Sequence, residues 1–152
     1  MKSLNKLFVL LFLFAGVGLS VFAEPQAVLT SEKTAVVSSQ IEVVKPSELV
    51  KMPDMYLDKT VKINARFDKF TTVGLDYPPA LRKSDDYISF LVYRDDTTFD
   101  IPQSELKFFM KRDDAQKFVD LKSKDKVSVT CKVFSTALGD PWVDVLKLET
   151  IK

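Results

Sequence analysis

Two segments of the chain alternate apolar and polar residues with a period of two, and this alternation constrains the fold more than any other feature. Successive side chains of a β-strand point to opposite faces, so the pattern predicts strands that bury one face and expose the other. We therefore expect strands over about residues 60–72 and 126–136. The apolar positions are Val61, Ile63, Ala65 and Phe67 in the first segment and Val127, Val129, Cys131 and Val133 in the second.

Three further strands are expected between and after these two segments. Residues 87–94, YISFLVYR, are apolar on both faces, which is typical of a central strand. Residues 98–103 follow the turn-forming DDTT and predict a short third strand, and residues 142–151 predict the last strand. The segment between the first two strands contains glycine, prolines and charged residues, so we expect a long loop there.

Helices are expected before the first strand and between the third and fourth strands. The expectation depends on side chains that accept hydrogen bonds from the first turn of a helix and on prolines that suit that turn. The predicted helices are a short one capped by Ser47 with a further turn from Pro53, residues 105–110 capped by Ser104, and residues 114–123 with a capping box of Asp113 and Gln116.

Three strands, a helix and two strands, preceded by a short helix, are the element order of the five-stranded OB-fold, a Greek-key barrel. The fold class is therefore predicted to be mainly β, an OB-fold-like barrel with a helix between strands three and four. The alternative is another small β-barrel or an α+β sandwich.

Particular motifs carry a family resemblance. The stretch from PSELVKMPDMYLDKTVKINARF to LKSKDKVSVTCKVFS resembles the bacterial secreted OB-fold domains of the anticodon-binding-like group. In that group a short helix precedes the first strand and a glycine-bearing strand follows the inter-strand helix. Ala65, Lys124 and Cys131 stand here where glycines are common in the group. The resemblance covers about residues 44–152 and implies an OB-fold barrel.

The N-terminal residues have the order of a secretory signal peptide. Lysines precede an apolar run that ends in small residues, and cleavage is expected after Ala23. A permanent membrane anchor is the alternative, although the run is shorter than the roughly 20 apolar residues that a spanning helix prefers. We therefore predict a signal peptide over residues 1–23, a flexible leader over 24–43 and a folded domain over 44–152. The mature protein is expected to be periplasmic or extracellular and to have no membrane span.

The composition excludes several kinds of chemistry. The chain contains no histidine and one cysteine, Cys131, so Ser-His-Asp and Cys-His catalysis, zinc sites that use imidazole and an intramolecular disulfide are all excluded. Cys131 lies on the apolar face of a predicted strand, and we expect it to be buried and unreactive. Loss of Lys2 and Lys6 with the signal peptide would change the net charge from +1 to −1, which gives no general attraction for nucleic acid.

The candidate ligand site is framed by two glycines. Gly74 and Gly139 are the glycines of the predicted mature chain, and they fall in the loops between strands one and two and between strands four and five. OB-folds commonly bind ligands between these two loops. Gly139 is also expected to ease the turn into the last strand. The candidate ligand-binding residues are Tyr77, Tyr87, Tyr93, Arg94, Asp140 and Trp142.

These residues leave several functions open. The leading hypothesis is an exported, monomeric, non-catalytic OB-fold-like binding module of unknown ligand. The alternative is a structural or protein-interaction domain of the cell envelope. An oligonucleotide or oligosaccharide binder and a cation-dependent, nuclease-like enzyme are less favoured, because aspartates crowd the aromatic residues and no metal-binding spacing is present. We expect no catalytic residue, metal or cofactor. A site for small ligands should expose several of the candidate aromatic side chains, whereas an interaction domain should bury them.

Overall fold

The computed structural model describes residues 40–152. The predicted signal peptide, residues 1–23, lies outside the described residues, and so does the predicted leader up to residue 39. At the end of that leader a short strand, β1 (Glu42–Val43), pairs in parallel with β2 (Thr60–Thr71).

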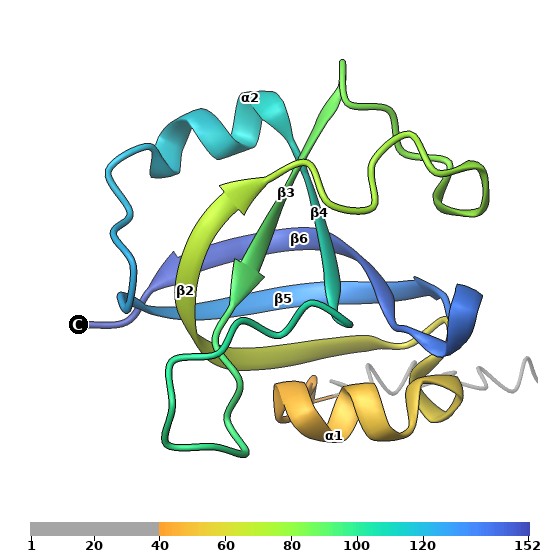
Figure 1. The fold of residues 1–152 in the computed structure, drawn as a ribbon, viewed down its shortest axis with the longest axis horizontal. Helices are drawn as coiled ribbons and strands as arrows, with labels where there is room; N and C mark the ends of the chain where they lie inside the picture. The colour runs from red at the N-terminus through yellow and green to blue at the C-terminus, as the bar shows by residue number, and fades with distance from the viewer. Residues whose placement is uncertain (1–39) are drawn as a thin grey trace, which may run out of the picture. The chain divides into compact units, whose positions relative to one another are not determined.

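Five strands close into a barrel (Figure 1). β2 pairs with β3, β3 with β4, β4 with β6 and β6 with β5, and β5 pairs back with β2. The β4–β6 pair is parallel and the other pairs of the barrel are antiparallel. This is the strand order of an OB-fold, so the predicted barrel is confirmed. The other strands are β3 (Tyr87–Val92), β4 (Lys107–Lys111), β5 (Lys126–Ser135) and β6 (Trp142–Thr150).

The third strand of the barrel lies where a helix was predicted. Residues 105–110 were expected to be helical after a Ser104 cap, but Lys107–Lys111 form β4. Residues 98–103, the predicted third strand, contribute only an isolated bridge between Tyr93 and Pro102. Both predictions were wrong because residues 108–110 are apolar at consecutive positions, and periodicity alone does not separate a buried strand from a buried helix.

The helix predicted between the third and fourth strands is present but short. The helix α2 (Arg112–Ala115) continues into the 3₁₀ helix η3 (Gln116–Phe118), and the pair lies near one end of the barrel in Figure 1. The N-cap residue is Lys111, and no side chain caps the helix. The predicted capping box of Asp113 and Gln116 is therefore absent.

The N-terminal helix, at the opposite side of the barrel, is held by hydrogen bonds to a residue far from it in the sequence. The helix α1 (Pro46–Lys51) begins after Lys45, and Ser47 lies within it rather than capping it. The backbone N–H and the hydroxyl of Ser47 both donate to the Asp95 carboxylate, at 2.8 and 3.0 Å. Pro53 does begin the next turn, η1 (Pro53–Tyr56), as predicted.

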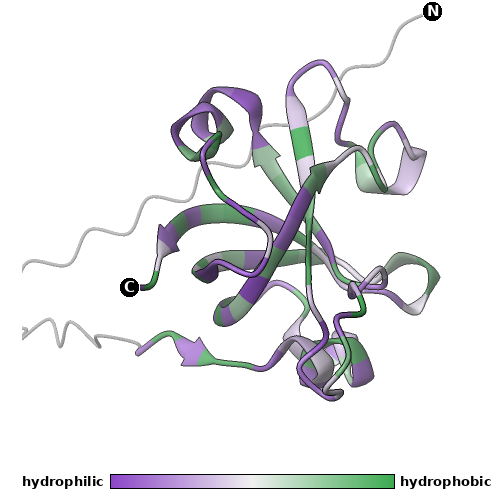
Figure 2. Cartoon of the chain, turned by 60° about the vertical axis from the view of Figure 1, so that its left-hand side comes forward, coloured by the Kyte–Doolittle hydropathy of each residue, from purple (hydrophilic) through white to green (hydrophobic). Residues whose placement is uncertain are grey.

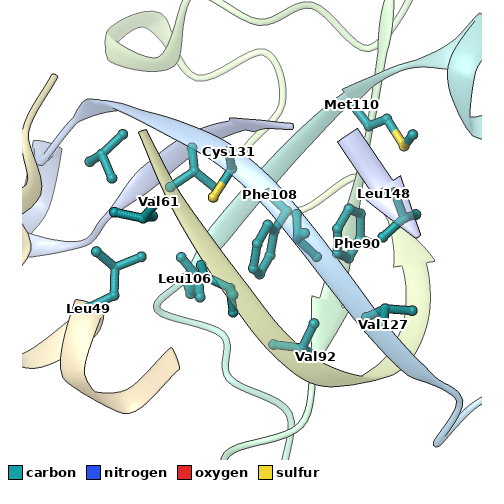
Figure 3. Packing of buried hydrophobic residues seen from close by; sticks show 14 of the residues in the cluster. Leu49, Val61, Phe90, Val92, Leu106, Phe108, Met110, Val127, Cys131 and Leu148 are labelled. Atoms are coloured by element: carbon teal, nitrogen blue, oxygen red, sulfur yellow. The ribbon is translucent and has the colours of Figure 1, made fainter. Parts of the chain in front are cut away.

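The main core fills the inside of the barrel, and α1 contributes Leu49 to it (Figure 3). Phe90 of β3 and Phe108 of β4 stack at its centre, with ring centroids 4.6 Å apart. In Figure 2 the strands carry both hydrophobic and hydrophilic residues, as expected where alternate side chains face the core and the solvent. Cys131 points into this core and is fully buried, as predicted. Burial raises the pKa of its thiol to about 12, so the thiol is unreactive in the folded chain.

Candidate functional site

The loops that contain Gly74 and Gly139 meet at the same end of the barrel, at Trp142. The β2–β3 loop, residues 72–86, includes the 3₁₀ helix η2 (Pro78–Ala80), and the β5–β6 loop, residues 136–141, includes η4 (Ala137–Gly139). Both glycines have positive φ, +82° and +76°. A Cβ atom added to Gly74 would lie 3.1 Å from the ring of Phe109 and 3.3 Å from that of Trp142, whereas one added to Gly139 would meet nothing within 4 Å. Gly74 thus lets the β2–β3 loop approach these two rings closely.

Trp142 is the middle ring of a stack of three. Its centroid lies 5.8 Å from Phe109 and 5.4 Å from Tyr77, with interplanar angles of 16° and 20°. The indole N–H donates to the carbonyl oxygen of Ala137 at 2.7 Å, so the β5–β6 loop is fixed to the same ring. Only 2% of Trp142 is exposed. The indole therefore packs between the two loops and offers no open face to a ligand.

These rings belong to a second, smaller cluster on the outside of the barrel, which we call the outer cluster. Phe108 and Met110 point into the main core, so Phe109, which lies between them on β4, points outward. The β2–β3 loop covers this outward face, which is the region where OB-folds commonly bind ligands. The outer cluster consists of Ala80, Phe109 and Trp142, with Leu75, Tyr77, Tyr87, Phe134 and Ala137 packed against them.

Arg82 joins the β2–β3 loop to β6. Its Nε and Nη2 atoms donate to the two carboxylate oxygens of Asp144, at 2.8 and 2.5 Å. The guanidinium carbon also lies 4.2 Å from the ring centre of Phe134 and 5.4 Å from that of Tyr87. The hydrogen bonds to Asp144 raise the pKa of Arg82 above its ordinary value, so the group is a permanent cation. Sequence reasoning missed this pair because its partners are 62 positions apart.

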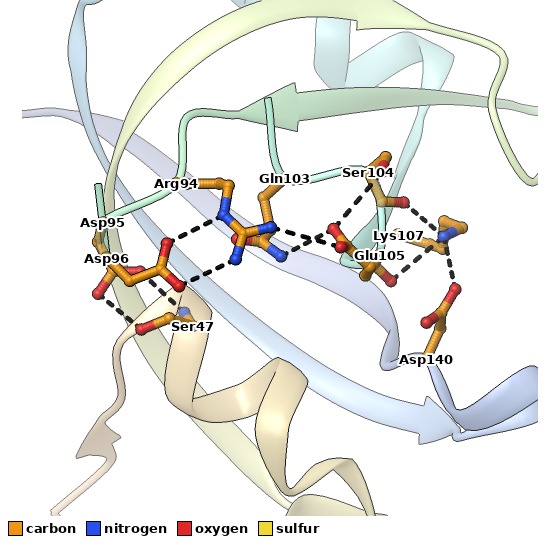
Figure 4. A network of polar contacts seen from close by, with 9 residues as sticks. All are labelled: Ser47, Arg94, Asp95, Asp96, Gln103, Ser104, Glu105, Lys107 and Asp140. Carbon is orange, nitrogen blue, oxygen red and sulfur yellow. Dashed lines mark hydrogen bonds and ion pairs between the residues drawn. The ribbon is translucent and has the colours of Figure 1, made fainter. Parts of the chain in front are cut away.

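Asp140, a predicted ligand-binding residue, is engaged by Lys107 of β4. The Lys107 ammonium group donates to the Asp140 carboxylate at 2.9 Å and to the carbonyl oxygens of Ser104 and Glu105 at 2.5 and 3.2 Å (Figure 4). Both side chains are largely buried. This ion pair therefore fixes the β5–β6 loop to the barrel, as Arg82 fixes the β2–β3 loop.

The remaining predicted residues, Tyr93 and Arg94, lie away from this end. Tyr87 begins β3 and Tyr93 follows its last residue, so the two are about 20 Å apart along the strand. Tyr93 is buried, its hydroxyl lies 2.9 Å from the Ser123 hydroxyl, and the guanidinium carbon of Arg66 lies 5.0 Å from its ring centre.

Arg94 makes two 2.9 Å hydrogen bonds to Asp96 and a 3.5 Å ion pair with Glu105 (Figure 4). Arg94 and Tyr93 line a shallow pocket of about 250 Å³ with Asn64, Arg66 and Lys126 among its other residues. The six predicted ligand-binding residues thus fall into two separate groups, of which Tyr77, Tyr87, Asp140 and Trp142 form the group at the loops.

The two loops expose apolar side chains that sequence reasoning did not select. Leu81, in the β2–β3 loop, is 81% exposed, and Leu138, in the β5–β6 loop, is 75% exposed. Each has a left-handed backbone, with φ of +51° and +64°. Leu81 borders a surface groove of about 320 Å³ that Tyr77 and Arg82 also line. A leucine in a loop carries no signal that separates an exposed side chain from a buried one, so only the structure identifies these two.

Within residues 40–152, no three metal-ligating side chains are grouped so that they could hold a metal ion. Nor is any helix in this range both long enough and apolar enough to span a bilayer. Three carboxylates of the loop end, those of Asp76, Asp140 and Asp144, are engaged with backbone or basic groups. Asp76, for example, accepts a 2.9 Å hydrogen bond from the Ser84 N–H, and its pKa is lowered by its hydrogen bonds with Ser84.

No protein-family model matches this sequence, and a search of curated proteins finds no significant match. Among solved structures, OBody AM3L09 bound to hen egg-white lysozyme is 14% identical with a TM-score of 0.49, over 75% of this chain and 98% of that one. A protein of Klebsiella pneumoniae, provisionally named a nucleic acid-binding lipoprotein, is 11% identical with a TM-score of 0.49, over 74% and 92%. Asparaginyl-tRNA synthetase from Pyrococcus horikoshii is 22% identical with a TM-score of 0.47, over 74% of this chain and 24% of the synthetase. The chain thus spans about a quarter of the synthetase.

Proposed function

We propose that this chain is an exported, non-catalytic binding module that engages a protein partner through the end of the barrel where the β2–β3 and β5–β6 loops meet. The observation that carries the proposal is the exposure of Leu81 and Leu138. They are the two most exposed large hydrophobic side chains among residues 40–152, and one lies in each loop.

Neither leucine is explained by the stability of the fold. A side chain with a left-handed backbone costs about 1–2 kcal/mol relative to a right-handed one, and an exposed leucine recovers little of this through burial. Such conformations persist where the surrounding structure imposes them, and they are concentrated at binding sites. Contact with an apolar region of a partner protein would bury both side chains and account for their placement.

The aromatic side chains support a protein partner over a nucleobase or a sugar. A stacking surface should leave several of Tyr77, Tyr87, Tyr93 and Trp142 exposed, but Tyr93 and Trp142 are buried and the other two are half-buried. The β2–β3 loop also carries the exposed carboxylates of Asp76, Asp85 and Asp86, which repel the phosphates of an oligonucleotide.

Export and the lack of catalysis are parts of the proposal that rest on the sequence. Residues 1–23 have the order of a signal peptide, and the chain lacks histidine, the side chain that most often acts as a general base near neutral pH. Mass spectrometry of the protein exported by its host is expected to find an N-terminus at Glu24. An N-terminus at Met1 in the exported fraction would contradict cleavage.

The proposed surface is tested by site-specific photo-crosslinking in the producing cells. Benzoylphenylalanine is placed at Leu81, at Leu138 and, as controls of matched exposure, at Phe99 and Val119, each 72% exposed. The same protein adduct is expected from both loop positions and from neither control. The adduct from position 81 should be lost when Leu138 is replaced by asparagine.

Two outcomes would contradict the proposal. Adducts of equal yield at all four positions would indicate nonspecific contact with neighbouring proteins. Saturable quenching of Trp142 emission by a single-stranded oligonucleotide at low salt, with no adduct at either loop position, would show that the module binds nucleic acid instead.

A further inference from the structure

The surroundings of Arg82 have the composition of a binding site for a guanidinium group. A carboxylate, Asp144, accepts two parallel hydrogen bonds, and two aromatic rings, Phe134 and Tyr87, lie within the range of cation–π attraction. The side chains of Arg82 and Asp144 are only 18% and 29% exposed, so their attraction is less screened than that of a surface pair. Asp144, Phe134 and Tyr87 come from the barrel, whereas Arg82 comes from the β2–β3 loop.

Residues 73–82 of the loop that supplies Arg82 make their backbone hydrogen bonds within the loop. The Asp76 N–H donates to the Arg82 carbonyl oxygen at 2.9 Å, and the Ala80 N–H donates to that of Tyr77 at 2.9 Å. Among the described residues, no backbone hydrogen bond joins residues 73–82 of the loop to β4, β5 or β6. Arg82 is also the loop residue that forms an ion pair with these strands. Undocking residues 73–82 would therefore break side-chain contacts and leave the hydrogen bonds within the loop intact.

We propose that Asp144, Phe134 and Tyr87 form a receptor for an arginine side chain, that Arg82 fills this receptor in the free protein, and that an arginine of the partner protein displaces it. The inference rests on the proposed function in one respect, namely that the occupant from outside is a protein. The β2–β3 loop then acts as an intramolecular competitor, which lowers the apparent affinity of the site for any external guanidinium group.

The chemistry of the receptor selects arginine over lysine. The guanidinium group is planar and carries two parallel N–H donors that match a carboxylate, and it stacks on aromatic rings. An ammonium group is a point charge that would satisfy only one carboxylate oxygen at a time and is more strongly hydrated. The ring of Phe134, 4.2 Å from the guanidinium carbon, is placed to favour the planar group.

The test empties the receptor and refills it with a small molecule. The variant Arg82→Ala is titrated with methylguanidinium at millimolar concentrations, and the thermal unfolding midpoint is measured. We expect the midpoint to rise and reach a plateau in this variant, because the ligand binds the folded state. We expect no rise with methylammonium, and binding of methylguanidinium to the wild type should be at least tenfold weaker.

Two matched variants identify where the ligand binds. Arg82→Ala combined with Asp144→Asn should show no rise, because the carboxylate is lost. Arg66→Ala, which removes an arginine from the more exposed pair with Asp100 and from the ring of Tyr93, should also show no rise in this range. If Arg82→Ala does not fold, Arg82→Lys supplies the same test, because its ammonium group leaves one carboxylate oxygen free.

The possible results separate this inference from the proposed function. No plateau in a folded Arg82→Ala or Arg82→Lys, or equal stabilisation of Arg66→Ala, would overturn the receptor. A plateau of equal affinity in the wild type would overturn the competition by Arg82. Neither result depends on the crosslinking at Leu81 and Leu138, so the receptor can fail while the proposed surface holds, and the reverse.

Discussion

The two apolar clusters of this protein share a strand but differ in origin. Phe108 and Phe109 are neighbours on β4, yet Phe108 belongs to the main core inside the barrel and Phe109 belongs to the outer cluster. A large part of the main core comes from β2 and β5, whose apolar residues alternate with polar ones. The outer cluster is built where two irregular loops dock on outward-facing rings. The main core is therefore held in place by strand pairing, whereas the outer cluster is held by the packing of loop side chains.

The largest effect is expected from truncating the two neighbouring rings in turn. Phe108→Ala should lower the free energy of unfolding by about 3–5 kcal/mol, because it leaves a cavity that the barrel cannot close. Phe109→Ala should cost about 2–3 kcal/mol, because the β2–β3 loop can move in part into the space. Urea denaturation measures both, and Phe99→Ala, at a side chain 72% exposed, is the control. Equal costs for the two rings would remove the distinction between the clusters.

The next effect separates steric contact from backbone strain. Gly74→Ala should lower the free energy of unfolding by about 2–3 kcal/mol. The new Cβ atom would strain the left-handed backbone and would also press against the rings of Phe109 and Trp142. Gly139→Ala has the same backbone strain and no contact within 4 Å, and should cost about 1 kcal/mol. Thermal unfolding of the two variants tests this. Equal losses would mean that the loop does not need its close approach to the outer cluster.

Hydrogen exchange should reveal which cluster opens first. The amide of Asp76 bonds within the β2–β3 loop, and that of Val133 bonds to the carbonyl oxygen of Lys59 beside the main core. We expect the opening free energy at Asp76 to be about 2 kcal/mol or more below that at Val133, because loop contacts are fewer and lie at the surface. The exchange rates of these two amides provide the comparison. Similar protection would show that loop and barrel unfold as one unit.

The smallest effect is expected at the exposed leucines. Leu81→Asn and Leu138→Asn should each change stability by about 0.5 kcal/mol or less, and in the stabilising direction, because asparagine tolerates a left-handed backbone. Val119→Asn, at a side chain of similar exposure with φ of −61°, gains no such relief and is the control. A loss well above 1 kcal/mol at either leucine, measured by urea denaturation, would show that the fold itself needs the side chain.

The sequence predicted β2, β5 and the last strand, β6, more accurately than the other elements. Residues 60–72 and 126–136 were expected to be strands, and β2 and β5 end within one residue of these bounds. The error at β4 arose because both faces of this strand are buried, one by each cluster, so no polar position marks its period. The cap of α1 was missed for a different reason. Asp95, which accepts from Ser47, follows 48 positions later, beyond the reach of any local motif.

The candidate site was predicted only in outline. The two glycine loops were identified, and they do meet at Trp142, but the prediction also joined Tyr93 and Arg94 to them. Those two residues follow the last residue of β3. The six-residue strand therefore separates them from Tyr87 and from the loops. Arg82, Leu81 and Leu138 were not selected. The role of Arg82 depends on its contact with Asp144. The role of the two leucines depends on their exposure, which residue type alone does not give.

The sequence by itself determined the positions of β2, β5 and β6, the apolar faces of β2 and β5 and the absence of histidine chemistry. These depend on residue type and on spacing along the chain, which hydrophobic periodicity records directly. The tertiary structure alone decided that β4 pairs with β6, that the β2–β3 loop covers the outer face, and that Arg82 meets Asp144. Such contacts join residues far apart in the sequence, and they form because strand pairing and burial bring those residues together, which no local pattern encodes.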